Sequence, residues 1–108
     1  MDVTQLNYIR SQYADPTDPN SKPEDTFEGR LNTIITEDTM LLRMADHQFV
    51  FDDANEMLVV QPIKKQADGT TYYPIKLFIP YDRIMSIHMD NYAKLRDNMF
   101  QGNVDHWG

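Results

Sequence analysis

The apolar side chains in the middle of the chain recur at every second position. Met40, Leu42 and Met44 alternate with their neighbours, and Phe49 and Phe51 resume the alternation after a short polar interruption. A period of two is typical of a strand with one face on a core and the other on solvent. This segment therefore predicts a β-hairpin, in which two paired strands are joined by a turn.

Three further strands follow. The first is apolar enough to be buried on both faces, although Pro62 should lie at an edge or a bulge because proline has no N–H to donate. The second is rich in Thr, Tyr and Ile, which favour strands, and the third places Ile84 and Met85 on opposite faces. The three strands are predicted over residues 57–63, 70–79 and 84–88.

The pattern before these strands is different. Leu6, Ile9 and Tyr13 lie at helical spacing, which predicts a short helix over residues 3–13 with Thr4 capping its start.

Residues 14–26 hold three prolines among Asp, Asn and Ser, and predict a loop or linker because proline interrupts regular hydrogen bonding. Residues 27–36 allow either a helical turn or a strand. Apolar side chains at helical spacing in residues 90–101 predict a C-terminal helix.

Length and composition narrow the class of protein. The chain has 108 residues, the size of one domain. It has no cysteine, which excludes disulfides and cysteine-based zinc sites and fits a reducing compartment. The N-terminus does not have the pattern of a signal peptide, and no apolar run is long enough to span a membrane. We therefore expect a cytoplasmic protein without a membrane partner.

Charge is unevenly distributed along the chain. The net charge is −7, which argues against a uniformly basic coat for nucleic acid. Residues 1–59 hold 12 acidic and 4 basic side chains, whereas residues 60–89 hold 4 basic and 2 acidic ones. The basic segment is either a solvated face or a face that contacts phosphates.

Two segments resemble the motifs of the Sm/LSm family. In residues 53–60, Asp-Ala-Asn-Glu-Met-Leu-Val-Val, Asp53 takes the position of the aspartate of the first motif. Glu56 and Met57 replace that motif's apolar-Asn pair, and Asn55 stands close to the position of its base-contacting asparagine.

The second motif resembles that of the bacterial host-factor branch, in which Tyr-Lys-His precedes two apolar residues and a serine. Within residues 79–87, Tyr81 and Ser86 match this pattern, and Asp82 and Arg83 replace Lys-His. The composition, rich in Met, Asn and Tyr, also looks like that of a small phage-encoded protein.

The resemblance implies a mainly β fold, a small five-stranded bent-sheet barrel of the Sm-like or SH3-like type with a helix at each end. The chain then divides into an N-terminal helix and Pro-rich linker (1–37), the barrel (38–89), and a C-terminal helix and tail (90–108). The family also implies a homo-oligomeric ring, in which strand four of one subunit pairs with strand five of the next. Nucleic acid would bind near the pore, at the two motif loops.

Two candidate contacts lie in the turn before the last strand. Arg83 would meet phosphate or a base through the paired N–H groups of its guanidinium. The alternative is a surface arginine paired with Asp82 or another carboxylate. Tyr81 would stack on a base, and the alternative is a tyrosine of the core or of an interface.

Five more candidates lie elsewhere. Lys64, Lys65 and Lys76 would follow a nucleic-acid backbone through charge alone, or they simply make a hairpin soluble. Asp53 and Asn55 would hydrogen-bond a base edge, or they serve only the turn that their side chains favour.

The sequence contains no motif for catalysis or for metal binding. The acidic residues near His47 match no ligand spacing, and neither a Gly-rich phosphate loop nor a Gly-x-Ser-x-Gly elbow occurs. We therefore predict a protein that is not an enzyme and has no metal and no cofactor. An enzyme with a shallow carboxylate site is left as a third hypothesis.

The first hypothesis for function is an Sm-like ring that binds RNA or single-stranded DNA in nucleic-acid processing. The second is an acidic protein-interaction or structural module of a phage, without nucleic-acid binding. The acidic first half of the chain favours the second, because it repels nucleic acid and resembles it towards a basic partner.

Overall fold

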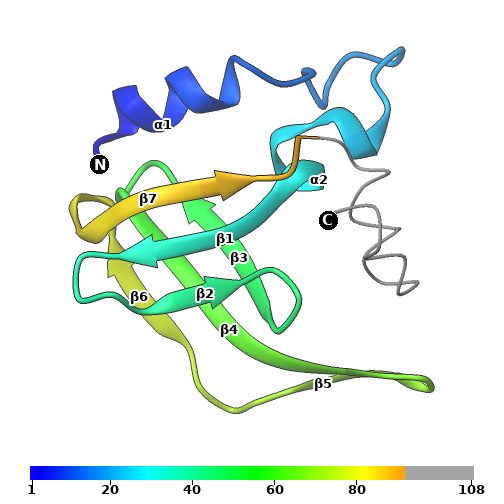
Figure 1. The fold of residues 1–108 in the computed structure, drawn as a ribbon, viewed down its shortest axis with the longest axis vertical. Coiled ribbons are helices and arrows are strands. Elements are labelled where there is room, and N and C mark those ends of the chain that lie inside the picture. The colour runs from blue at the N-terminus through cyan, green and yellow to red at the C-terminus, as the bar shows by residue number, and fades with distance from the viewer. Residues whose placement is uncertain (92–108) are drawn as a thin grey trace, which may run out of the picture.

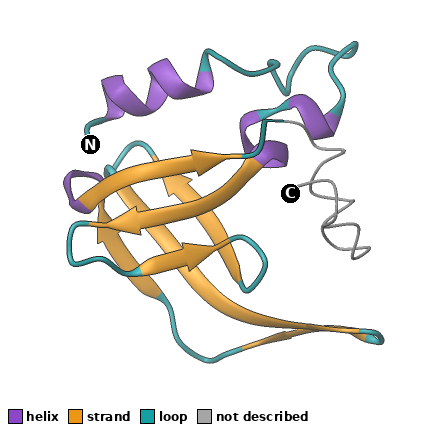
Figure 2. Cartoon of the chain, viewed as in Figure 1, coloured by secondary structure: helices purple, strands orange, loops and turns teal. Residues whose placement is uncertain are grey.

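Residues 1–91 are described by the computed structural model, which is mainly β with short helices near its start (Figures 1 and 2). The helical segments are α1 (Val3–Arg10), η1 (Pro23–Asp25), α2 (Phe27–Arg30) and η2 (Tyr81–Arg83), the η elements being single 3-10 turns. The strands are β1 (Leu31–Thr36), β2 (Leu41–Arg43), β3 (His47–Asp52), β4 (Met57–Gln66), β5 (Gly69–Tyr72), β6 (Leu77–Pro80) and β7 (Ile84–Met89).

All strand pairs are antiparallel, and they form two sheets. The first sheet has the order β2-β1-β7. In the second, β4 lies between β3 on one side and both β5 and β6 on the other. The mainly β class is therefore confirmed. Among residues 1–91 the hydrogen-bonded strands do not close into one barrel, and they number seven rather than the five expected.

Proline accounts for one of the additional strands. The predicted strand over residues 70–79 is wrong as a single element, because it is divided into β5 and β6 around Pro74. Proline has no N–H for the ladder. The break lies opposite Pro62, whose carbonyl accepts a hydrogen bond from the Tyr73 N–H at 3.1 Å. Pro62 itself lies where the partner of β4 changes from β6 to β5.

The predicted alternation is confirmed by burial in β3 and β7, whereas the predicted hairpin is wrong, because β2 pairs with β1 and β3 pairs with β4. Phe49 and Phe51 pack against the core, whereas Val50 between them is 55% exposed. In β7, Ile84 is buried and Met85 is 53% exposed, as their opposite faces require.

The N-terminal helix is confirmed, but its cap is not the predicted one. Asp2 is the N-cap: its carboxylate accepts from the Gln5 N–H at 2.8 Å, and the Gln5 side chain accepts from the Asp2 N–H at 2.8 Å. This reciprocal pair satisfies two N–H groups that the first turn leaves free, so Thr4 has no capping role. The helix buries Leu6 and ends at Arg10.

The segment of residues 27–36 contains both structures that the sequence allowed. Thr26 caps α2 by accepting a hydrogen bond from the Gly29 N–H at 3.1 Å, and β1 follows directly. Ala14 and Thr26 form an isolated parallel bridge that closes the Pro-rich linker. Strand β1 precedes residue 38, so the first sheet begins upstream of the expected barrel.

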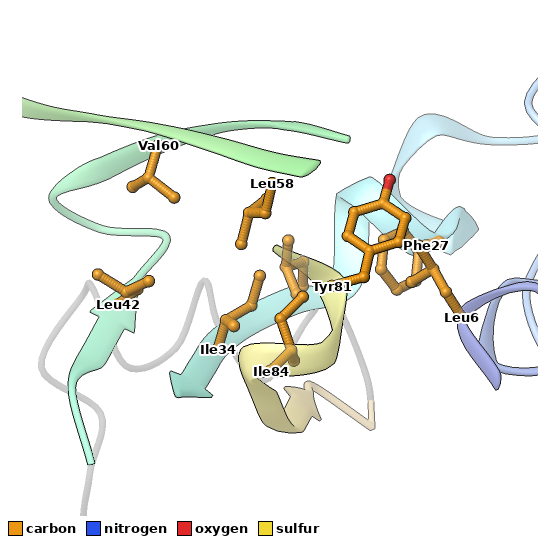
Figure 3. Close-up of a cluster of buried hydrophobic side chains, with 9 residues drawn as sticks. Leu6, Phe27, Ile34, Leu42, Leu58, Val60, Tyr81 and Ile84 are labelled. Carbon is orange, nitrogen blue, oxygen red and sulfur yellow. The ribbon is translucent and has the colours of Figure 1, made fainter. Parts of the chain in front are cut away.

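One core joins the helices to both sheets. Leu6 from α1, Phe27 from α2 and Tyr81 from η2 gather at one end of it, with Leu42 and Val60 at the other (Figure 3). Each is at most 3% exposed. The buried cluster comprises Leu6, Phe27, Leu31, Ile34, Leu42, Leu58, Val60, Tyr81 and Ile84.

Two further expectations concern the ends of the chain and the membrane. The predicted C-terminal helix falls almost wholly outside the described residues. Within residues 1–91, no helix has the length and apolar character needed to cross a membrane.

Candidate nucleic-acid interface

The two loops that resemble the family motifs lie side by side. The Tyr81 N–H at the start of η2 donates to the Glu56 carbonyl at 2.9 Å. The Tyr81 hydroxyl donates to Oδ1 of Asp53 at 2.6 Å. Residues 52–56 and 80–83 are thus brought together, as expected for a common site.

Tyr81 and Asp53 are occupied in an internal network. Arg10 reaches from the end of α1 and donates from both terminal nitrogens to the Asp53 carboxylate, at 2.7 and 3.2 Å. The guanidinium also lies over the rings of Phe51 and Phe27, at 5.5 and 5.9 Å from their centroids. This network fixes α1 against the loop of residues 52–56.

The charges in this network follow from its geometry. The hydrogen bonds from Arg10 lower the pKa of the Asp53 carboxyl below its ordinary value of 3.8, with a smaller contribution from the Tyr81 hydroxyl. Burial, together with the hydrogen bond to Asp53, raises the pKa of the Tyr81 hydroxyl. Tyr81 is 2% exposed, so its ring packs in the core and does not present a face to a base in this conformation.

Asn55 is used in its own turn. Its N–H and its side-chain amide donate to the Asp52 carboxylate at 3.2 and 2.8 Å. Glu56 closes the turn with a positive φ of 49°. This is the local role that Asp and Asn often have in turns; the bond to Asp52 uses one N–H of the Asn55 side-chain amide and leaves its second N–H and its carbonyl oxygen unused.

Arg83 is the exposed cation of η2. Its side chain is 69% exposed, and its nearest carboxylate is that of Glu37 at 4.0 Å, not that of neighbouring Asp82. An ion pair so long and so exposed holds the side chain only weakly. The guanidinium is therefore largely open to solvent.

A cleft of about 450 Å³ lies beside η2, and its charged lining is acidic. It is bounded by α1 and by the two motif loops, with the carboxylates of Asp2, Glu56 and Asp82 along it. An anionic ligand would be repelled there. Arg83 lines a different cleft of about 270 Å³, together with Phe78, Met40 and the acidic residues Glu37 and Asp38.

Two of the three candidate lysines lie on a part of the chain that is remote from this region. Lys64 and Lys65 lie on the end of β4 that projects with β5 from the rest of the sheet, and Lys76 follows β5. In Figure 1 the tip of this projection lies on the opposite side of the molecule from the turn between β6 and β7. The structure therefore places Lys64 and Lys65 apart from the turn candidates, whereas Lys76 directly precedes β6, the strand that leads into η2.

Arg10 is the functional side chain that the sequence patterns missed. It lies four residues after buried Leu6, on the helix face that meets the sheet. A cation at that position implies an anionic partner nearby, which is Asp53 in the turn after β3. Among residues 1–91, no cluster of three or more His, Asp or Glu side chains is arranged to hold a metal ion.

Comparison of the chain with protein-family models, with curated proteins and with solved structures gives no match.

Proposed function

We propose that this chain is an Sm-like protein that assembles into a homo-oligomeric ring and binds RNA or single-stranded DNA. The observation that carries the proposal is the placement of β6 and β7. They are edge strands of different sheets, and the three residues of η2 join them. In the Sm/LSm family, strand four of one subunit pairs with strand five of the next. The resemblance therefore implies that these two strands lie at free edges.

The strand count fits the same arrangement. β2 and β3 are strands of different sheets, but they follow one another through a turn of three residues and in this proposal take the place of one bent strand. β5 and β6 are two parts of one strand interrupted at Pro74. The seven strands then reduce to five, with the last paired to the first.

The two free edges carry exposed apolar side chains. Phe78 on β6 is 62% exposed and Met85 on β7 is 53% exposed. Met85 lines a cleft of about 540 Å³ between α1 and β7. Pairing of β6 with β7 of a second copy would satisfy both edges and cover these side chains, which removes the hazard of an open edge.

The assembly is tested by a charge placed on the β7 edge. The Met85→Glu substitution is expected to convert the ring to monomers in sedimentation velocity, because a carboxylate would be buried between subunits. Val50→Glu is the matched control, since Val50 is 55% exposed on β3, away from both edges in question. Unchanged assembly of the Met85 variant would exclude this edge as the interface.

Nucleic-acid binding is tested at Arg83. The Arg83→Glu variant is expected to lose oligonucleotide binding while its native mass stays unchanged. Arg43→Glu is the control, because Arg43 is also exposed and lies outside η2, on β2. Normal affinity of the Arg83 variant would exclude η2 as the site. In this proposal the protein acts in the cytoplasm, that of a bacterial host if a phage encodes it.

One observation favours the second candidate, an acidic interaction module of a phage. Val50, Val59 and Phe78 lie in register across the outer face of the second sheet, and Val50 and Phe78 are more than half exposed. An apolar row in an acidic protein suits a protein partner with an apolar, basic surface. Absence of oligonucleotide binding at low salt would favour this candidate.

A further inference from the structure

The end of β4 and the whole of β5 form a two-stranded projection, here called the arm. Residues 63–66 pair with residues 69–72, and Gly69 in the connecting turn has a φ of 144°, which favours glycine. Every residue from 64 to 76 is exposed. Figure 1 shows the arm extending beyond the other strands. An isolated two-stranded ribbon is only marginally stable, so the arm contributes little to the stability of the core.

The arm concentrates positive charge in an acidic protein. Lys64 and Lys65 lie on it, Lys76 follows it, and Asp68 is the single acid between them, whereas the whole chain has a net charge of −7. Among the ion pairs within residues 1–91, none involves these three lysines. Their ammonium groups are therefore available to an anionic partner.

Two exposed tyrosines accompany the lysines. Tyr72 is 54% exposed and Tyr73 is 45% exposed. The backbone of Tyr73 is fixed on both sides, because its N–H donates to the Pro62 carbonyl at 3.1 Å and its carbonyl accepts from the Gln61 amide at 3.2 Å. A ring held on a fixed backbone and left open to solvent is a ready stacking platform.

The ladder register distributes these side chains over both faces of the arm. Lys65 pairs with Thr70, and Lys64 with Thr71. Directly paired residues project from one face, and successive residues project from opposite faces. Tyr72 therefore shares a face with Lys65 as its diagonal neighbour. Lys64 projects from the other face, and the alternation of side chains along the strand places Tyr73 on the same face as Lys64.

We propose that the arm binds single-stranded nucleic acid, with Lys64 and Lys65 contacting phosphates and Tyr72 and Tyr73 stacking on unpaired bases. The inference rests on the proposed function and adds a second site, remote from Arg83. A single strand fits better than a duplex, because stacking on a side chain requires a base face that a duplex covers. Cations beside aromatic rings are the combination that non-sequence-specific single-strand binders use.

The test is fluorescence anisotropy of labelled oligo-dT and oligo-rU of about 20 nucleotides with the full chain at roughly 50 mM salt. Tyr72→Leu and Tyr73→Leu keep an apolar strand residue but remove the ring, and each is expected to weaken binding by about fivefold to 150-fold. Tyr72→Phe keeps the ring and should bind as the wild type does. Tyr8→Leu is the matched control, because Tyr8 is 68% exposed on α1.

The lysines give an independent readout. Replacing Lys64 and Lys65 by Gln should reduce the slope of log affinity against log salt by about 1.4, because two phosphate contacts are lost. Replacing exposed Lys22 by Gln should leave the slope unchanged.

The outcomes separate the two proposals. Wild-type affinity in the leucine variants, combined with loss of binding in Arg83→Glu, would overturn the arm and leave the proposed function intact. Tighter binding of a duplex than of either single strand would also overturn the arm. If the wild-type protein bound no oligonucleotide, the proposed function would fail and the arm site with it.

Discussion

Asp53 is the side chain on which the junction of α1 and the motif loops depends. Its carboxylate accepts hydrogen bonds from Arg10 at 2.7 and 3.2 Å and from Tyr81 at 2.6 Å. The Asp53→Ala substitution removes all three. It leaves the hydroxyl of Tyr81, a residue only 2% exposed, without its acceptor.

The size of the effect follows from these contacts. A hydrogen bond to an ionised group contributes about 1.5–3 kcal/mol, and a buried donor left without a partner costs about 1–3 kcal/mol. The side chains of Arg10 and Asp53 are 24% and 46% exposed, so solvent screens their attraction. Such a pair adds only about 0.2–1 kcal/mol. We expect a loss of about 2 kcal/mol in the free energy of unfolding.

Thermal and urea denaturation measure this loss. A decrease of about 2 kcal/mol lowers Tm by roughly 8 °C in a domain of this size, compared at one protein concentration because assembly also shifts Tm. Asp82→Ala is the control, since Asp82 is exposed in η2 and its loss changes the charge equally. Surface changes of this kind stay within about 0.5 kcal/mol.

A double substitution sharpens the test. Adding Tyr81→Phe to Asp53→Ala should restore part of the lost stability, because it removes the hydroxyl that has no acceptor. Equal stability of Asp53→Ala and Asp82→Ala would show that the three hydrogen bonds to Asp53 do not stabilise the fold. The same would follow if Tyr81→Phe lowered the stability of Asp53→Ala as much as it lowers that of the wild type.

Two other predictions concern the same fold. The folded-state pKa of the Asp53 carboxyl lies below 3.8. Its contribution to stability is therefore complete above pH 3.8 and is lost as the pH falls through the lower folded-state pKa. An acid titration followed by circular dichroism should show a smaller loss of stability below pH 3.8 for Asp53→Asn than for the wild type. Gly29→Ala should destabilise the protein by about 1–3 kcal/mol in urea denaturation, because a Cβ at this position would lie 2.1 Å from the Pro23 carbonyl oxygen. A Gly29→Ala protein as stable as the wild type would show that η1 moves aside without cost.

The alternation of apolar and polar residues predicted the central strands, because a shift of one residue in register would exchange their buried and exposed faces. Phe49 and Phe51 point inward and Val50 outward, as a period of two requires. The turn before the last strand was also predictable, since Pro80 and Asp82 favour turns. The confirmed features are those that depend on local sequence.

The errors in the prediction have physical causes of two kinds. The β-branched and aromatic residues over residues 70–79 favour one strand, but Pro74 removes an N–H from its middle. The role of Arg10 depends on Asp53, which is 43 residues away in the chain, and single-sequence patterns contain no information on such contacts. For the same reason the burial of Tyr81 could not be read from the turn that contains it.

Light scattering after size exclusion of the wild-type protein tests the central proposal most directly. The chain has a mass of 12.7 kDa. We expect one discrete species of about five to seven subunits, which is roughly 64 to 89 kDa for a closed ring built from one repeated interface. A species of 12.7 kDa at all concentrations would contradict the Sm-like ring, and would leave β6 and β7 as free edges of a monomeric interaction module.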